Sequence, residues 1–480
     1  MRRTFGGDIF FAGIAELSAG LRAGDISAAD LARAFSERLE KLGPRYNALA
    51  LSLRERGLDT AGEADDEIKR GRLRGPLQGI PYAAKDLLSA AGKPTTWGAP
   101  PYAGQIFDYD ATPIARLEKA RAPLIGKLAM VALAGGCGYG YASASMFGPG
   151  LNPWDVTRWS GGSSSGPASA VAAGLVPFAL GSETWGSIMT PCAYCGITGV
   201  RPTYGLVSRY GAMALSWTLD KIGPMARSAE DCGIVLQAIA GGDSKDPGSA
   251  GKGFHYVPQY ARKFEDTRIG FAAVDVEEWA EPSAQPAFRE ALKVLGGIGC
   301  PMAETELPDY PYELVIGYII ASEAAAVFEP LIAGGRVDEL PDREQAARLK
   351  AAIDVRAKDY LKAMRIRRLA QDALRALFID FDILVSPAMF GPAPTVDAPL
   401  DARPARPAPS RRGLSALSAA GNLAGLPAVF LPCGFAGGLP VGIQLVGRPF
   451  TENTLLAVAG EFQKRTDWHK MRPPVPSLKD

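Results

Sequence analysis

The chain has 480 residues, of which 47% are hydrophobic, and its formal net charge is +1 at pH 7. This length and composition are typical of a globular protein with a large core. A charge so close to zero leaves no electrostatic footprint for nucleic acid or for an anionic membrane surface, so we expect neither as a partner.

The N-terminus resembles an export signal only faintly. Arg2 and Arg3 form a twin arginine, but the apolar run that follows, residues 9–15, is short and lies between Asp8 and Glu16. No apolar stretch in the chain reaches the roughly 18 residues that a membrane-spanning helix needs. We therefore expect a cytoplasmic protein.

Helices and strands alternate along the chain. Leu31, Phe35 and Leu39 recur at helical spacing and predict a helix over residues 27–42, which Ser27 can cap. A second helix is predicted over about residues 57–70. Apolar, strand-like runs follow at residues 77–88, 123–126, 176–180, 268–273 and 382–386. This alternation predicts an α/β fold.

One charged residue stands out in the first strand-like run. Lys85 lies in an otherwise apolar segment, residues 79–88, where a lysine is out of place. A buried lysine has a lowered pKa and can then serve as a base near neutral pH. The alternative is a surface ion pair between Lys85 and its neighbour Asp86, and the local sequence does not decide between the two.

Two serines follow glycine turns in the middle of the chain. Ser163 lies in Gly-Gly-Ser-Ser-Ser-Gly and Ser187 ends Gly-Ser-Glu-Thr-Trp-Gly-Ser, with the apolar segment 168–180 between them. A flexible linker would be polar without interruption, so the apolar segment excludes that interpretation. We expect both hydroxyls to lie close together in the interior.

Residues 162–166 also match the G-x-S-x-G nucleophile motif, which needs a preceding strand and a downstream acid and histidine. The preceding residues, 154–159, form no clear strand in the sequence, and the only histidines, His255 and His469, lie in no motif. We therefore do not expect a Ser-His-Asp enzyme.

The cysteines indicate no cofactor. Cys192 and Cys195 form a C-x-x-C pair, but no second pair completes a zinc site, and six cysteines in 480 residues are too few for a disulfide framework. The glycine cluster at 136–140 lacks the strand-turn-helix frame of a nucleotide site. We expect neither metal nor cofactor.

These features together resemble the amidase signature family, and the resemblance covers nearly the whole chain. The matching segments are Gly79 to Leu88 with Lys85, Asn152 to Asp155, Gly161 to Gly166, Gly181 to Ile188, Cys195 to Gly205, Leu219 to Pro224, Asn422 to Ala428 and Gly438 to Gln444. The family resemblance implies one amidase-signature domain over 1–480, built on a single large mixed β-sheet with helices on both faces. Within it we expect an N-terminal helical layer (about 1–70), a catalytic core (71–240), a variable helical region (241–380) and a C-terminal completion of the core (381–480).

The resemblance also implies a Ser-Ser-Lys triad. Ser187 would be the acylated nucleophile, Ser163 the bridging serine after a cis peptide bond, and Lys85 the base, while Ser164 would support the loop. An oxyanion hole would be formed by backbone N–H groups of Thr184, Trp185, Gly186 and Ser187. By analogy with family loops, the substrate would contact Gly135, Gly136, Cys137, Trp185 and Met189.

The chain departs from the family pattern at three places. Glu183 replaces the usual aspartate, and Trp185 replaces a glycine, which puts the geometry of the turn in doubt if a positive φ is needed there. Met189 stands where many relatives carry an arginine. A glutamine-hydrolysing subunit must bind a zwitterion, so the missing arginine disfavours one.

From these residues we expect an amidase that cleaves the C–N bond of small, apolar or aromatic amides through an acyl-enzyme, with carbamates, urethanes, esters or anilides as further substrates. Its partner would be that small molecule alone, with no cofactor, and the protein would be a monomer or homodimer. The alternative is the A subunit, the glutaminase, of a tRNA-dependent amidotransferase, which releases ammonia from glutamine for transfer to a charged tRNA. We expect the variable region, including the helical patterns over residues 313–334 and 342–377, to help set substrate preference.

Overall fold

The computed structural model describes residues 8–257, 263–400 and 408–476. The twin arginine, Arg2 and Arg3, lies outside the described residues. Within them, no helix combines the length and apolar character needed to cross a membrane.

An eleven-stranded sheet runs through the described part of the chain. In spatial order its strands are β1 (Leu49–Ser52), β3 (Leu124–Leu128), β2 (Tyr82–Lys85), β6 (Phe178–Glu183), β8 (Lys221–Ala226), β7 (Thr198–Arg201), β12 (Ala428–Ala436), β13 (Leu439–Gly447), β11 (Ile383–Pro387), β9 (Ile269–Phe271) and β10 (Met302–Glu304). Strands β3, β2 and β6 are parallel, as are β11, β9 and β10, whereas the other neighbouring pairs are antiparallel. The predicted mixed sheet is therefore confirmed.

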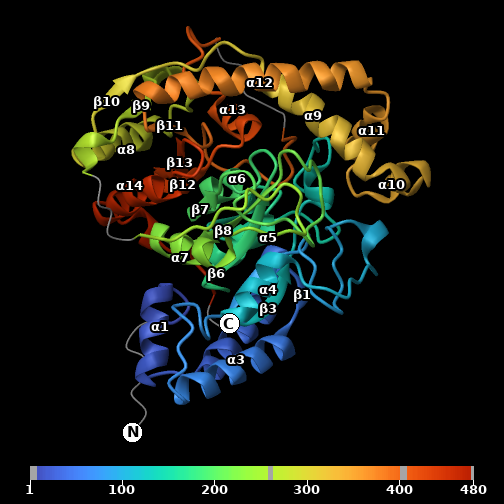
Figure 1. Ribbon diagram of the computed structural model, residues 1–480, viewed down its shortest axis with the longest axis vertical. Coiled ribbons are helices and arrows are strands. Elements are labelled where there is room, and N and C mark those ends of the chain that lie inside the picture. The colour runs from blue at the N-terminus through green and yellow to red at the C-terminus, as the bar shows by residue number, and fades with distance from the viewer. Residues whose placement is uncertain (1–7, 258–262, 401–407, 477–480) are drawn as a thin grey trace.

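The helices pack on this sheet and at its ends. They are α1 (Ile14–Ala23), α2 (Ala28–Leu42), α3 (Arg54–Lys69), α4 (Thr112–Lys119), α5 (Ser165–Ala172), α6 (Met189–Cys195), α7 (Ala229–Ile239), α8 (Gln285–Gly297), α9 (Tyr312–Val327), α10 (Glu329–Ala333), α11 (Arg343–Ala352), α12 (Ala357–Asp380), α13 (Leu417–Ala424) and α14 (Glu452–Lys464). Helices α1 and α3 lie at one end of the long axis of the molecule, and α12 lies at the other (Figure 1).

The parallel strands β2 and β6 position the conspicuous polar residues. Lys85 ends β2, and Glu183 ends β6. The two strands are direct neighbours, with Ala84 opposite Leu180. Because parallel neighbours end at the same edge of a sheet, both side chains are brought to one edge, where the serine loops also lie.

Most predicted elements are confirmed, with small shifts. The Ser27 hydroxyl caps α2 by accepting a hydrogen bond from Asp30 N at 3.0 Å, and α3 begins at Arg54, slightly before the expected start. The predicted helical pattern over 342–377 is two helices, α11 and α12, with a break between them.

One expectation is wrong. Residues 155–159 do form a strand, β5 (Asp155–Trp159), which pairs with β4 (Leu151–Asn152) in a separate two-stranded sheet. The strand is short and carries Asp155 and Arg158, so it lacks the apolar alternation that marks a core strand in sequence. The histidine condition still fails, because His255 lies in an extended loop and His469 in a short 3-10 turn near the C-terminus.

Candidate active site

Lys85 is fully buried and surrounded by hydroxyl groups. Its Nζ donates hydrogen bonds to Ser163 Oγ at 2.7 Å, to Ser182 Oγ at 2.9 Å and to Ser164 Oγ at 3.0 Å. Asp86 instead lies 2.9 Å from Lys127 Nζ, and both of those side chains are buried as well. The structure therefore excludes a surface ion pair between Lys85 and Asp86.

The electrostatic environment of Lys85 suits a base. Burial lowers the pKa of Lys85 to about 7, although the charges of Asp220 and Glu183 act in the opposite direction. An amine with this pKa is unprotonated in a substantial fraction of molecules at neutral pH and can accept a proton. The three hydroxyl neighbours satisfy the lysine without fixing it as a permanent cation, as a carboxylate in direct contact would.

The two serine loops lie against each other. The Gly162–Ser163 peptide bond is cis. Ser164 N donates to the carbonyl oxygen of Ser187 at 3.3 Å, and Ser164 Oγ donates to Ser182 O at 3.2 Å. These contacts hold the loop that carries Ser163 against the segment that carries Ser182 and Ser187.

The turn at residues 184–187 resolves the doubt about Trp185. Gly186 has φ +82°, whereas Trp185 is not among the residues with positive φ, so the left-handed position falls on a glycine. Within the described residues, no intramolecular acceptor is found for the N–H groups of Trp185, Gly186 and Ser187. Three unpaired donors on one turn are suited to bind an oxyanion.

Glu183 holds this turn in place. Its Oε2 accepts hydrogen bonds from Ile188 N at 2.8 Å and Met189 N at 3.0 Å, and its Oε1 accepts from Arg201 and Asn422, both at 2.8 Å. Burial raises the pKa of Glu183, but the Arg201 charge and the hydrogen bonds outweigh it and lower the pKa to about 2. The carboxylate is thus charged at neutral pH and ties the start of α6 to the end of β6.

A cavity of about 350 Å³ opens at Ser187. Gly135, Gly136, Cys137 and Trp185 line it, as predicted, and aromatic side chains form much of the wall: Tyr139, Trp159 and Tyr194. Met189 is not among its lining residues and is buried beneath the turn. We refer to this space as the Ser187 cavity.

An arginine that the sequence did not reveal lies beside the Ser187 cavity. Gly138 lines the cavity, and a β-carbon at this position would lie 2.6 Å from Nη1 of Arg348 on α11. The other terminal nitrogen of Arg348 donates to Glu344 at 3.0 Å. Helix α11 is fixed there because Asp342 at its N-terminus accepts hydrogen bonds from Gly140 N and Tyr141 N. The glycine cluster at 136–140 therefore allows a helix to pack closely against the cavity wall.

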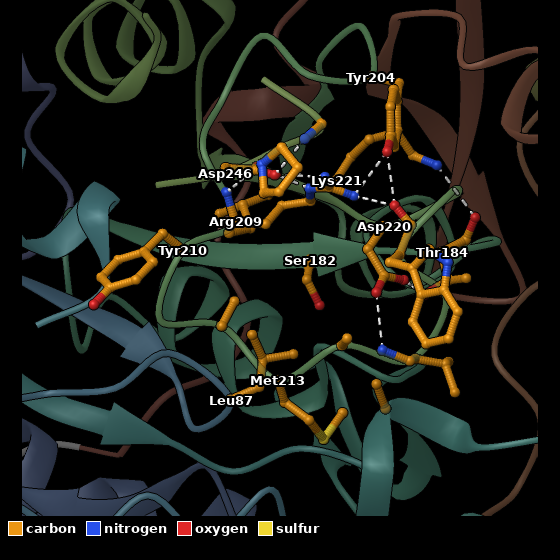
Figure 2. Close-up of a pocket in the computed structure, with 18 of the residues that line it drawn as sticks. Leu87, Ser182, Thr184, Tyr204, Arg209, Tyr210, Met213, Asp220, Lys221 and Asp246 are labelled. Carbon is orange, nitrogen blue, oxygen red and sulfur yellow. Dashed lines mark hydrogen bonds and ion pairs between the residues drawn. The ribbon is translucent and has the colours of Figure 1, made fainter. Parts of the chain in front are cut away.

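A second cavity, of about 480 Å³, lies behind the serine loops. Ser182, the hydroxyl partner of Lys85, lines it together with Thr184, Asp220 and Lys221 (Figure 2). We refer to it as the Ser182 cavity. The two cavities share three lining residues: Ala134, Thr184 and Leu215. Ser187 thus lines one cavity, and Ser182, the hydroxyl partner of Lys85, lines the other.

The C-x-x-C pair lies in α6, where Cys192 and Cys195 are buried free thiols whose pKa values burial raises. In the described parts of the chain, no group of three or more His, Cys, Asp or Glu side chains is placed to hold a metal ion.

Comparison with known proteins agrees with this geometry. The Amidase family profile matches residues 30–456. The A subunit of glutamyl-tRNA(Gln) amidotransferase from Carboxydothermus hydrogenoformans is 36% identical over 98% of this chain and 100% of its own length, and that of Chloroflexus aurantiacus is 38% identical over 95% and 96%. Among solved structures, native peptide amidase from Stenotrophomonas maltophilia superposes with a TM-score of 0.82 and 31% identity, over 96% of this chain and 98% of that one.

The relatives overturn two expectations from the sequence. A free-standing amidase for small apolar or aromatic amides or carbamates is contradicted, because the curated relatives named above, at 36% and 38% identity, are A subunits of glutamyl-tRNA(Gln) amidotransferases. These relatives are subunits of an enzyme that is named for a tRNA substrate. They therefore also contradict the expectation of a monomer or homodimer that has no nucleic acid among its partners. The expectation failed for two physical reasons: Met189 does not line the Ser187 cavity, so its identity says little about the substrate, and overall net charge says nothing about subunit interfaces.

The mixed sheet, the order of the motifs and the lysine-serine cluster agree with a profile that matches most of the chain and with relatives that cover almost all of it. The chain therefore belongs to the amidase family, the amidase signature enzymes.

Proposed function

We propose that this chain is the glutamine-hydrolysing subunit of a tRNA-dependent amidotransferase, which releases ammonia for transfer to a charged tRNA. The observation that carries the proposal is the 36–38% identity to the A subunits of such enzymes over 95–98% of the chain. The hydroxyl contacts of Lys85 support this proposal, because they provide a proton relay to Ser163.

Ser187 acts as the nucleophile. Its hydroxyl attacks the side-chain carbonyl of glutamine while its proton passes to Ser163, whose own proton passes to neutral Lys85 at 2.7 Å. The proton then returns through Ser163 to the leaving nitrogen, so ammonia departs and a γ-glutamyl ester remains on Ser187. Water, activated by the same relay, hydrolyses this ester to glutamate and free enzyme.

The unpaired N–H groups of the 184–187 turn stabilise the tetrahedral intermediate. Each donor in such a hole typically contributes roughly 2.7 to 4 kcal/mol to transition-state stabilisation. Glu183 fixes the following N–H groups, those of Ile188 and Met189, so the turn is preorganised before substrate binds.

Arg348 is the group that would bind the α-carboxylate of glutamine. It does not itself line the Ser187 cavity but lies against Gly138, which does, and it pairs with Glu344 at 3.0 Å. Guanidinium groups bind carboxylates in a charge-assisted, planar geometry, so Arg348 would have to turn from Glu344 towards the cavity to bind the substrate. The requirement for a cation is therefore met from α11, not from position 189, where the sequence pattern pointed.

The Ser182 cavity offers the released ammonia a path away from the triad. Ser182 contacts Lys85 on one side and lines this cavity on the other, and its neighbours Thr184, Asp220 and Lys221 are polar. An ammonia molecule leaving near Lys85 thus meets hydrogen-bonding groups, as transfer to a partner subunit requires.

Two assays test the proposal. Ammonia release from glutamine is measured for the chain alone and for the chain combined with the other subunits of the C. hydrogenoformans amidotransferase, with Gln-tRNA(Gln) formation as the second readout. We expect glutamine hydrolysis that the partner subunits increase and that Ser187→Ala abolishes. Ammonia release from benzamide but none from glutamine, with partner subunits present, would contradict the proposal.

A further inference from the structure

A buried acid on helix α9 contacts the loop that borders the active site. Glu323 lies on α9, is 2% exposed, and forms no ion pair within the described residues. Helix α9 also supplies Gly317 and Ile320 to the wall of the Ser187 cavity. Helix α9 therefore contributes both to the wall of the Ser187 cavity and to the contacts that Glu323 makes.

Glu323 holds the loop at residues 215–220. It accepts hydrogen bonds from the Ser216 hydroxyl, from Thr218 N at 3.2 Å and from Thr218 Oγ1 at 2.8 Å. Tyr360 on α12 donates to the same carboxylate at 2.9 Å. Arg367, also on α12, donates to Thr218 Oγ1 at 3.0 Å and to Thr218 O at 2.9 Å. The loop is thus clamped from two helices.

The other end of this loop contacts the turn at residues 184–187, which we call the oxyanion turn. Asp220 accepts hydrogen bonds from Leu215 N at 2.8 Å and Ser216 N at 2.9 Å with one oxygen, and from the Thr184 hydroxyl with the other. Thr184 is the first residue of the 184–187 turn, and Asp220 and Thr184 lie beside each other in the wall of the Ser182 cavity (Figure 2). Ser216 is therefore bonded to Glu323 through its side chain and to Asp220 through its backbone.

This chain of contacts explains why a carboxylate is buried on a helix that carries no motif. Burying a charge is costly unless hydrogen bonds satisfy it, and here the satisfying donors come chiefly from one loop. A loop held at both ends presents Asp220 to Thr184 in one geometry. We propose that Glu323 is a positioning residue that fixes the oxyanion turn through the 215–220 loop. This inference rests on the proposed role of Ser187 as nucleophile, but not on glutamine as its substrate.

The test measures acylation of Ser187 by p-nitrophenyl acetate, an activated ester that needs the oxyanion turn but no substrate carboxylate. The burst rate constant and the apparent KM are compared for the wild type, Glu323→Ala and Glu323→Gln, with folding checked by circular dichroism and thermal unfolding. We expect Glu323→Ala to slow acylation by about 10- to 100-fold with KM changed less than about twofold. Glu323→Gln keeps one acceptor and is expected to recover part of the rate.

Glu452 provides the matched control. It is 1% exposed and accepts hydrogen bonds from Thr203 N at 2.8 Å and Thr203 Oγ1 at 2.6 Å, as Glu323 does from Thr218, but it faces a different loop. We expect Glu452→Ala to lower the unfolding temperature while the acylation rate constant stays within about twofold of wild type. A comparable slowing in Glu452→Ala would mean general destabilisation and would overturn the proposal.

Two further variants, Ser216→Ala and Ser187→Ala, complete the test. Folded Glu323→Ala that acylates at the wild-type rate overturns the proposal. If Glu323→Ala does not fold, Ser216→Ala decides instead: it removes one bond to Glu323, and we expect acylation to slow by roughly 3- to 10-fold, whereas an unchanged rate overturns the proposal. A burst that persists in Ser187→Ala refutes the nucleophile assignment itself, which separates that failure from failure of the role given to Glu323.

Discussion

Two regions of the molecule contribute to the site in different ways. The serine-lysine centre, Lys85 with residues 160–188, is built from strand ends and glycine turns, and its polar groups lie in recognisable motifs. The helical cover, residues 312–380, has no motif, yet it brings Arg348 to Gly138, in the wall of the Ser187 cavity, and Glu323 to the 215–220 loop. In our proposal, the centre carries the chemistry, and the cover contributes to substrate binding and to the position of the 184–187 turn.

The largest expected effect falls in the serine-lysine centre. Ser187→Ala removes the nucleophile, so we predict a loss of kcat for glutamine hydrolysis of about 10⁴-fold or more. Ser169→Ala is the control. Ser169 lies on α5, and its hydroxyl donates to Leu151 O at 2.8 Å and takes no part in the relay, so we expect its loss to leave kcat nearly unchanged. Steady-state ammonia release measures both. A Ser187→Ala enzyme with more than a tenth of the activity would mean that another group attacks the amide.

Glu183→Gln tests how much the buried Glu183–Arg201 pair contributes to the free energy of unfolding. The change leaves the Arg201 guanidinium buried without its countercharge, so we predict a loss of about 3 to 5 kcal/mol in the free energy of unfolding. Urea denaturation measures it. Glu339→Gln, which breaks an exposed pair with Arg336 on the helical cover, is expected to leave the free energy of unfolding nearly unchanged.

The same variant carries a pH signature. The folded pKa of Glu183, about 2, is below its usual value of 4.5, so its stabilisation is fully present above about pH 4.5 and is lost as the pH falls towards 2. We expect the difference in unfolding free energy between wild type and Glu183→Gln to shrink across this window. A difference independent of pH would mean that the carboxylate is not the source of the effect.

Arg348→Ala tests the helical cover. Loss of the carboxylate-binding group raises KM for glutamine by about 10- to 100-fold, while acylation by p-nitrophenyl acetate stays near the wild-type rate. Arg375→Ala, which removes an arginine paired with Asp372 on the exposed side of α12, is the matched control and changes neither. Equal losses with both substrates would show that Arg348 supports the fold and does not bind the carboxylate.

The last prediction concerns the pH dependence of acylation. Lys85 accepts a proton only when it is neutral, and its pKa of about 7 means that the neutral form is lost as the pH falls below that value. We predict that kcat/KM rises with an apparent pKa of about 7 and falls roughly tenfold per pH unit on the acid side. Arg348→Ala should keep the same midpoint. A flat profile between about pH 5.5 and 8 would exclude Lys85 as the base.

The sequence predicts the serine-lysine centre better than the helical cover for a physical reason. Lys85 is recognisable because a charge in an apolar strand is rare, and Ser163 and Ser187 because glycine turns precede them. The three groups are brought together by neighbouring parallel strands and their adjoining loops, which local pattern and family resemblance both indicate.

Arg348 and Glu323 could not be found in this way. Arg348 lies on α11 among other charged residues, whereas Glu323 lies on α9, a largely apolar helix that carries no motif. The role of each residue depends on where its helix packs. Packing of α11 against Gly138, and of α9 against Thr218, is a long-range contact that periodicity does not encode. The substrate expectation failed at the same point, since it sought the carboxylate-binding cation within the motif, at Met189.

The most direct measurement is the identity of the acyl-enzyme. The protein is mixed with glutamine and quenched in acid within the first turnover. It is then digested, and the masses of its peptides are measured by mass spectrometry. We predict one γ-glutamyl group, attached to Ser187, at lower occupancy in Arg348→Ala and absent in Lys85→Ala. A γ-glutamyl group on any other residue, or none on Ser187 while ammonia is being released, would contradict the proposed relay.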